Sequence, residues 1–255
     1  MKDKIKFSAA DWSFCGRSGL PPADYYAWLY KTGICGVEMV APENMAAARE
    51  AGLEIINMSG PGMTEGLNRT ENHAVLLPQI RAAIAQAQQA AIPALIIFSG
   101  NRGGQDDATG IANCITGIEQ VLDDARQAGV TLLLEMLNVY DHPDYQAASS
   151  AYGLALARHF DSPHLKLLYD VYHMERMGEN AAAVIPANLA QIAHLHVAES
   201  PRRSRPLAEG TINYATIVRA VHGAGYRGYW GMEYLAGADV LGELAQAVRE
   251  FEGLI

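Results

Sequence analysis

Residues 131–137 read TLLLEML, a nearly continuous apolar run with one acid, Glu135, close to its end. A strand with one face in water would alternate apolar and polar residues. A strand of a parallel sheet that helices cover on both faces is apolar throughout, as this run is. The stretch therefore predicts a buried parallel strand with Glu135 near its carboxyl end.

Seven further runs of the same kind occur along the chain. They are Ile5–Ala10, Gly36–Val40, Leu53–Met58, Ala94–Ser99, Leu165–Val171, Ile192–Ala198 and Gly228–Tyr234. Amphipathic helical patterns lie between them, most clearly at Glu71–Ala90, Asp107–Gln127 and Leu241–Phe251. Gly33, Gly52, Gly129 and Gly225 each follow a helical pattern and precede a strand, as helix-terminating glycines do. Eight strand–helix repeats in 255 residues predict an α/β fold of the (β/α)8 TIM barrel type.

An open, doubly wound sheet is the main alternative fold. Such a sheet ordinarily carries a phosphate-binding loop after its first strand, and no such loop follows Ile5–Ala10. The glycine-rich run at residues 101–104 (NRGG) follows the fourth strand and matches neither a dinucleotide-binding loop nor a P-loop. No linker, charge block or low-complexity segment divides the chain, so we expect residues 1–255 to form one domain.

Composition restricts the class of protein. A net charge of -9 disfavours nucleic-acid binding, which needs a basic face. No apolar segment is long enough for a signal sequence or a membrane span. The three cysteines form no CxxC pair and are expected to be small core residues in a reducing cytoplasm. We expect a cytoplasmic enzyme acting on a small molecule, with neither nucleic acid nor membrane as a partner; a homo-oligomer stays open.

Four residues that can bind a metal ion end four consecutive predicted strands: Glu135, Asp170, His196 and Glu233. In a parallel barrel the functional side chains project from the carboxyl ends of the strands. Neighbouring strands lie roughly 5 Å apart, so these residues can converge on one ion. Three carboxylates and one imidazole suit Mn, Mg or Co, with Zn left open. Any one acid could equally face solvent, but an acid inside an apolar run is costly unless paired or metal-bound.

Histidines near these strand ends are further candidates. His173 lies three residues after Asp170 and is expected either to donate a hydrogen bond to the substrate beside the metal, or to lie at the surface where a helix begins. We expect His194 to point away from His196, toward the helices, and to be structural. The remaining five histidines are expected to face solvent: His73, His142, His159, His164 and His222.

Three arginines, Arg202, Arg203 and Arg205, cluster after the seventh predicted strand. A guanidinium at the barrel mouth could hold a substrate carboxylate, and a solvated basic loop is the alternative. Glu38 ends the second strand and could either face the cavity or be structural. Aromatic residues near strand ends could line the pocket but are more often core; these are Trp12, Phe14 and Trp230.

The most specific motifs are residues 135–138 (EMLN) with Asp141, Pro143 and Tyr145 following, 168–174 (LYDVYHM), 193–198 (AHLHVA), 210–214 (GTINY) and 231–234 (GMEY). With these motifs the chain resembles the xylose isomerase-like barrel superfamily, and within it the hydroxypyruvate isomerase family, over nearly its whole length. The resemblance implies a metal-dependent isomerase of the aldose–ketose type. It also implies that Glu135 and Glu233 are the acid/base pair, and that His173 and an arginine after the seventh strand, Arg202 or Arg203, hold substrate oxygens.

Hydroxypyruvate isomerases usually carry glutamine where this chain has His196, whereas the related D-tagatose 3-epimerases carry histidine. The expected reaction is hydroxypyruvate to tartronate semialdehyde, or that of a related 2-oxo sugar acid. A ketose 3-epimerase of the D-tagatose/D-psicose type and a non-catalytic metabolite-binding barrel are the alternatives. Endonuclease IV shares the barrel but has additional histidine ligands at the ends of the third and fourth strands. Residues 57–59 (NMS) and 98–100 (FSG) contain no histidine, which disfavours a trinuclear zinc nuclease.

Overall fold

The computed structural model describes residues 4–207 and 210–255. The chain forms two compact units. Unit 1 comprises Met1–Ile56, Asn180–Leu189 and His194–Ile255, and unit 2 comprises Asn57–Glu179 and Ala190–Ala193. Among the described residues, no helix combines the length and the apolar character that crossing a bilayer requires.

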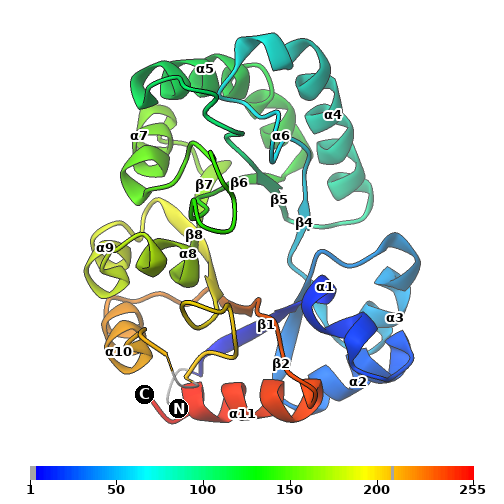
Figure 1. Cartoon of the computed structure of the whole chain (residues 1–255). Helices are drawn as coiled ribbons and strands as arrows, with labels where there is room; N and C mark the ends of the chain where they lie inside the picture. The colour runs from blue at the N-terminus through cyan, green and yellow to red at the C-terminus, as the bar shows by residue number, and fades with distance from the viewer. Residues whose placement is uncertain (1–3, 208–209) are drawn as a thin grey trace. The chain divides into compact units, whose positions relative to one another are not determined.

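Unit 1 contains a parallel sheet in the order β3-β2-β1-β9-β8, of which β1, β2 and β8 are labelled in Figure 1. Its strands are β1 (Lys6–Ala10), β2 (Ile34–Glu38), β3 (Glu54–Ile55), β8 (Ile192–Val197, of which the first two residues belong to unit 2) and β9 (Tyr229–Met232). Its helices are α1 (Asp11–Phe14), α2 (Pro22–Lys31), α3 (Met45–Glu50), α9 (Ala181–Ala187), α10 (Tyr214–Gly223) and α11 (Val240–Glu252), with short 3-10 turns at Cys15–Arg17 and Pro42–Asn44.

Unit 2 contains a parallel sheet in the order β4-β5-β6-β7. Its strands are β4 (Asn57–Ser59), β5 (Ala94–Ile97), β6 (Thr131–Glu135) and β7 (Leu165–Asp170). Its helices are α4 (Thr70–Gln89), α5 (Asp107–Glu119), α6 (Leu122–Ala128), α7 (Ser150–Phe160) and α8 (Val171–Arg176). Helices α4 to α7 pack against one another and against β5, β6 and β7, as the cyan and green ribbons of Figure 1 show.

All eight predicted strands are confirmed, but one predicted strand and one predicted helix are each divided in two. The run Leu53–Met58 forms two short strands, β3 and β4, separated at Ile56. The helical pattern Asp107–Gln127 forms two helices, α5 and α6, because Val121 between them leaves the helical conformation with φ -123°. The four predicted helix-ending glycines all have positive φ, the conformation in which glycine carries no steric penalty.

The core of unit 1 includes a cluster of aromatic rings around Phe251 of α11. Its ring lies edge-on to Phe7 of β1 and to Trp230 of β9, at centroid distances of 6.1 and 5.8 Å, and 5.2 Å from Tyr214 of α10. Cys15 and Cys114 are buried, as predicted for core residues, and Cys35 is half-buried. Phe14 and Trp230 are also core residues, whereas Trp12 is 47% exposed.

Replacing Phe251 by alanine is expected to lower the free energy of unfolding by about 3–5 kcal/mol, because the change leaves a cavity that three fixed rings line. Denaturant unfolding followed by circular dichroism measures this loss. The matched control is Leu235→Ala, since the Leu235 side chain is 50% exposed and its removal should change stability by less than about 0.5 kcal/mol. Equal effects of the two changes would contradict the assignment of Phe251 to the core.

Candidate metal centre

Glu233, directly after β9, is held by three side chains of unit 1. The indole Nε1 of Trp12 donates a hydrogen bond to Oε1 over 2.9 Å, and Arg203 donates to Oε2 over 2.5 Å. The imidazole Nδ1 of His196 lies 3.2 Å from the same Oε2. Burial acts to raise the pKa of Glu233, but His196 and Arg203 outweigh it and hold the pKa well below its ordinary value. Glu233 is therefore an ionised, buried carboxylate beside an imidazole nitrogen.

A second carboxylate of unit 1, Glu38 at the end of β2, is completely buried. Its Oε2 accepts from His194 Nε2 at 2.9 Å and from His196 Nε2 at 2.8 Å, and its Oε1 accepts from the Ser8 hydroxyl at 2.6 Å. Burial acts to raise the pKa of Glu38, but the two histidines outweigh it and hold the pKa well below 4.5. Ligand atoms of Glu38, His194 and His196 lie close enough together to hold a metal ion.

The prediction that His194 points away from His196 is wrong. Both rings reach the same oxygen of Glu38, and their centroids are 5.0 Å apart. The reason is the period of a strand: successive side chains alternate between faces, so residues two positions apart lie on the same face. Glu38, for which a structural role and a cavity-facing role were both open, binds these two histidines.

In unit 2, Glu135 is the last residue of β6 and is 6% exposed. Its backbone carbonyl accepts a hydrogen bond of 2.9 Å from the hydroxyl of Tyr145, which itself accepts from the backbone N–H of Ser99 at 3.0 Å. Ser99 follows β5, so one buried tyrosine ties together the carboxyl ends of two neighbouring strands. Tyr145 thereby fixes the backbone from which the Glu135 side chain projects.

Asp170 ends β7, which pairs with β6, and caps the N-terminus of α8. Its Oδ1 accepts from the backbone N–H of His173 at 3.2 Å, and its Oδ2 lies 3.6 Å from His173 Nε2. His173 is completely buried, so the alternative of a surface histidine at a helix start is wrong. His173 Nδ1 accepts from the backbone N–H of Asn138 at 3.1 Å, which leaves its proton on the Nε2 that faces Asp170.

Three polar residues around His173 appeared in the sequence only as motif members or not at all. The Asn138 amide contacts His173 Nδ1 at 2.6 Å and donates to Asp141 Oδ2 at 3.0 Å. Asp141 also accepts from Arg176 at 2.7 Å. Burial acts to raise the pKa of Asp141, but its hydrogen bonds and Arg176 outweigh it and lower that pKa. Asn138 and Asp141, in the segment after β6, thus hold the His173 ring in place. The position of a residue at a strand end does not reveal this role.

The three arginines after β8 differ in what they contact. Arg203 binds Glu233 and lies 5.2 Å from the ring centroid of Trp12. Arg205 pairs with Glu250 of α11 at 2.5 Å, which gives it a structural role. Arg202 is exposed. Arg203 is therefore the arginine that the structure brings to a predicted site residue.

The solvent-facing prediction for five other histidines is confirmed for His159 alone. His73 is buried, and its Nε2 lies 2.8 Å from the carbonyl oxygen of Leu67, because this ring faces inward from α4. His142, His164 and His222 are partly buried. Helical position alone therefore overestimated their exposure.

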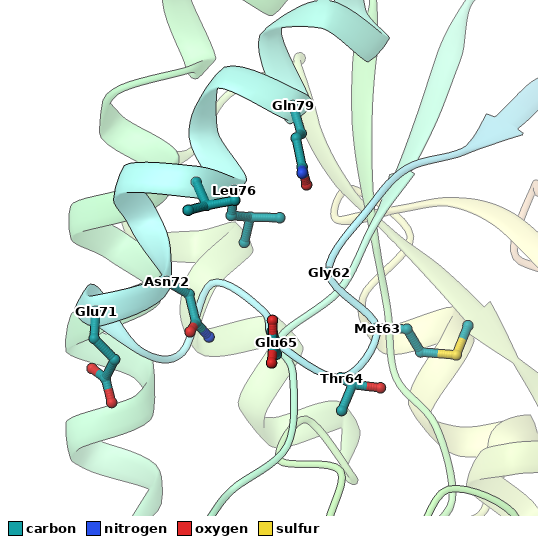
Figure 2. Close-up of a pocket in the computed structure, with 9 residues that line it drawn as sticks. Gly62, Met63, Thr64, Glu65, Glu71, Asn72, Leu76 and Gln79 are labelled. Carbon is teal, nitrogen blue, oxygen red and sulfur yellow. The ribbon is translucent and has the colours of Figure 1, made fainter.

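Each unit also contains a pocket. The pocket of unit 2, of about 450 Å³, is lined by Gly62, Met63, Thr64, Glu65, Glu71, Asn72, Val75, Leu76 and Gln79. Figure 2 shows it between the loop after β4 and α4. Its described lining includes two carboxylates and no basic side chain, which disfavours a 2-oxo acid as its occupant.

A pocket of unit 1, of about 430 Å³, is lined in part by Trp12 and Asp11. Burial raises the pKa of Asp11 to about 6.

The model of the family described as xylose isomerase-like TIM barrel matches residues 34–251. The chain belongs to this family. The predicted fold class, a (β/α)8 TIM barrel, is thereby confirmed.

Solved structures show the same fold. A family 2 AP endonuclease from Brucella melitensis superposes with a TM-score of 0.81 at 21% identity, covering 95% of this chain and 97% of that protein. A D-psicose 3-epimerase from Clostridium cellulolyticum H10 gives a TM-score of 0.78 at 17% identity, covering 98% of each chain. At such low identity these similarities concern the fold alone.

Curated relatives support an isomerase of this family. A putative hydroxypyruvate isomerase of Homo sapiens is 27% identical over 93% of this chain and 92% of its own length. The hydroxypyruvate isomerase of Escherichia coli K12 is 31% identical over 41% of this chain and 40% of its own length. A 2-oxo-tetronate isomerase of Cupriavidus necator is 31% identical over 43% of this chain and 42% of its own length. The resemblance to hydroxypyruvate isomerases that the sequence motifs indicate is confirmed.

Proposed function

We propose that this protein is a metal-dependent isomerase that moves a proton between adjacent carbons of a small hydroxy-carbonyl compound. The proposed reaction converts hydroxypyruvate to tartronate semialdehyde, or isomerises a related 2-oxo sugar acid. Relatives named as hydroxypyruvate isomerase and 2-oxo-tetronate isomerase support this substrate class. Glu135 and Glu233 would be the acid/base pair.

The proposed ligands of the metal ion are Glu135, Asp170, His196 and Glu233. The observation that carries this proposal is the approach of His196 Nδ1 to Glu233 Oε2, 3.2 Å apart, with both side chains buried. Two ligand atoms about 2.1 Å from one octahedral ion, at right angles to each other, lie roughly 3 Å apart, so this pair fits a divalent ion. In unit 2, Glu135 and Asp170 are buried at the ends of paired strands, which suits the two remaining ligands.

The proposed chemistry requires a proton to leave C3 of hydroxypyruvate and one to reach C2. The hydroxyl proton moves from the oxygen on C3 to the oxygen on C2, so the carbonyl passes from C2 to C3 and no oxidant is needed. Glu135 and Glu233 would take up and return the carbon-bound proton. A divalent ion, when bound, would stabilise the negative charge that develops on the two substrate oxygens. Buried His173, with its proton on Nε2, can donate to a substrate oxygen.

The proposal is tested by incubating the protein with Mn²⁺ and a substrate panel, and following the products by proton NMR. The panel contains hydroxypyruvate, 2-oxotetronate, ketohexoses and their phosphates. We expect conversion of hydroxypyruvate to its aldehyde isomer, tartronate semialdehyde, or of 2-oxotetronate to its 3-oxo isomer. Binding without turnover of any compound would indicate a non-catalytic metabolite-binding barrel.

One observation favours a second candidate, a ketose 3-epimerase of the D-tagatose/D-psicose type. By the resemblance of the sequence motifs, His196 stands where hydroxypyruvate isomerases usually carry glutamine and where the epimerases carry histidine. In that reaction the proton returns to the opposite face of the same carbon. Turnover of ketohexoses, with no conversion of the 2-oxo acids, would assign the chain to this class.

An arginine after β8 is expected to bind the carboxylate of a charged substrate. If the substrate is a 2-oxo acid, Arg203→Met or Arg202→Met is expected to raise KM for that acid by about 10- to 150-fold, because a charged hydrogen bond contributes about 1.5–3 kcal/mol. The effect on an uncharged ketose should be smaller. Arg205→Met is the matched control, since Arg205 pairs with Glu250. Unchanged kinetics of both variants on the acid would exclude the carboxylate clamp.

A further inference from the structure

Glu38 contacts a histidine that lies three strands away in the sheet of unit 1. Ser8 of β1 pairs with Gly231 of β9, and Gly231 pairs with His196 of β8. Glu38 extends from β2, on the far side of β1, and still reaches His196 at 2.8 Å. The Glu38 side chain thus passes two intervening strands to reach a third.

Two small residues, Ser8 and Gly231, leave the space through which the Glu38 side chain extends to His196. Ser8 has a short side chain, and its hydroxyl donates to Glu38 Oε1 over 2.6 Å. Gly231 has none, and a Cβ atom there would lie 2.4 Å from Glu38 Oε1 and 2.7 Å from His196 Cδ2. Both distances are far below van der Waals contact, so the carboxylate and the imidazole occupy the volume that any other residue at 231 would need.

The hydrogen bonds of Glu38 determine which nitrogen of His196 carries a proton. One carboxylate oxygen, Oε2, meets Nε2 of both His194 and His196, and such an oxygen accepts two N–H bonds readily. With Nε2 of His196 engaged as a donor, Nδ1 is the nitrogen directed toward Glu233 Oε2. A metal-binding histidine commonly donates its other ring N–H to a carboxylate, which fixes the tautomer and the ring orientation.

We infer that Glu38 is a positioning residue, which holds the His196 ring through Nε2 so that Nδ1 is presented beside Glu233 to a divalent cation. This inference rests on the proposed metal site. The His194 ring binds the same carboxylate oxygen of Glu38 and so helps to hold the Glu38 side chain in place. Glu38 contacts the histidine and not the ion, so its effect is on affinity and geometry.

The first test measures Mn²⁺ binding to metal-free protein by titration calorimetry. Wild type is expected to bind Mn²⁺, and Glu38→Gln, of equal size, should bind it about 10- to 100-fold more weakly. Gly231→Ala should weaken binding as well, because it displaces the carboxylate and the ring together. The control Glu54→Gln changes an exposed glutamate of β3 that contacts the Tyr229 hydroxyl at 2.7 Å, and should bind as wild type does.

A second measurement needs no variant and uses Zn²⁺ as a diamagnetic probe. Nitrogen-15 NMR of wild type should show His196 with a proton on Nε2 and the metal on Nδ1. Metal on Nε2 of His196 would overturn the inference and would instead indicate a site formed by Glu38, His194 and His196. Wild type that binds Mn²⁺, together with a folded Glu38→Gln variant of equal affinity, would overturn the inference and leave the proposed function intact. Wild type that binds no Mn²⁺ would instead overturn the proposed metal site itself.

Discussion

Glu233→Gln and Glu135→Gln are each expected to slow isomerisation by about 10²–10⁴-fold, the usual effect of losing a general base. Glutamine keeps the size of the side chain and a carbonyl oxygen, and removes the basic oxygen. The rate should therefore fall more than the affinity for metal. The measurement is turnover in deuterated water, with label followed by NMR at the carbon next to the carbonyl.

Wild type should incorporate solvent deuterium at that carbon, unless the enzyme passes the proton on without exchange. Glu54→Gln serves again as the control, since this exposed glutamate lies outside the candidate site. If both site variants keep the wild-type rate with metal still bound, another residue must carry the proton.

Removal of the metal is expected to abolish activity while the protein stays folded. A bound divalent ion contributes several kcal/mol of transition-state stabilisation, so its loss should lower kcat by about 10³-fold or more. The fold should persist because the core, for example the cluster around Phe251, consists of apolar and aromatic side chains. The measurement is activity after dialysis against EDTA and after addition of Mn²⁺, Mg²⁺ or Co²⁺, with circular dichroism at each step.

Two outcomes separate the role of the ion in catalysis from a role in folding. Loss of the circular dichroism signal on chelation would mean that the ion stabilises the fold, contrary to expectation. Full activity in protein shown to be metal-free by elemental analysis would exclude a metal-dependent reaction.

Most of the fold could be predicted because apolar runs and helix-ending glycines are local signals. Gly129, for instance, ends α6 in the left-handed conformation that its position before a strand predicts. The break at Val121 could not be predicted, because residues 118–124 contain no glycine or proline that would end a helix. The assignment of residues 1–255 to one domain stays a prediction.

The site was predictable where one strand carries the information, and less so where several strands cooperate. Glu233 and His196 end their own strands, and the structure brings them within 3.2 Å. The contact of Glu38 with His196 depends on the register of β2, β1, β9 and β8, which no single segment encodes. The prediction for His194 is wrong for a simpler reason: the period of a strand puts this residue on the same face as His196.

The groups around His196 determine which donor and acceptor atoms a side chain at position 196 must carry. On one side the Glu38 carboxylate requires a hydrogen-bond donor, and on the other Nδ1 would offer a lone pair to the proposed metal ion beside Glu233. A side chain there must therefore be bipolar, with donor and acceptor at opposite edges of one planar group. Glutamine meets this demand, since its amide carries an NH₂ and a carbonyl oxygen. Exchange of histidine for glutamine would thus keep a donor toward Glu38 and an electron-pair donor toward the metal, while changing the length of the side chain and the type of ligand atom. Position 196 is therefore a site where substrate preference can change while Glu38 and His194 stay the same.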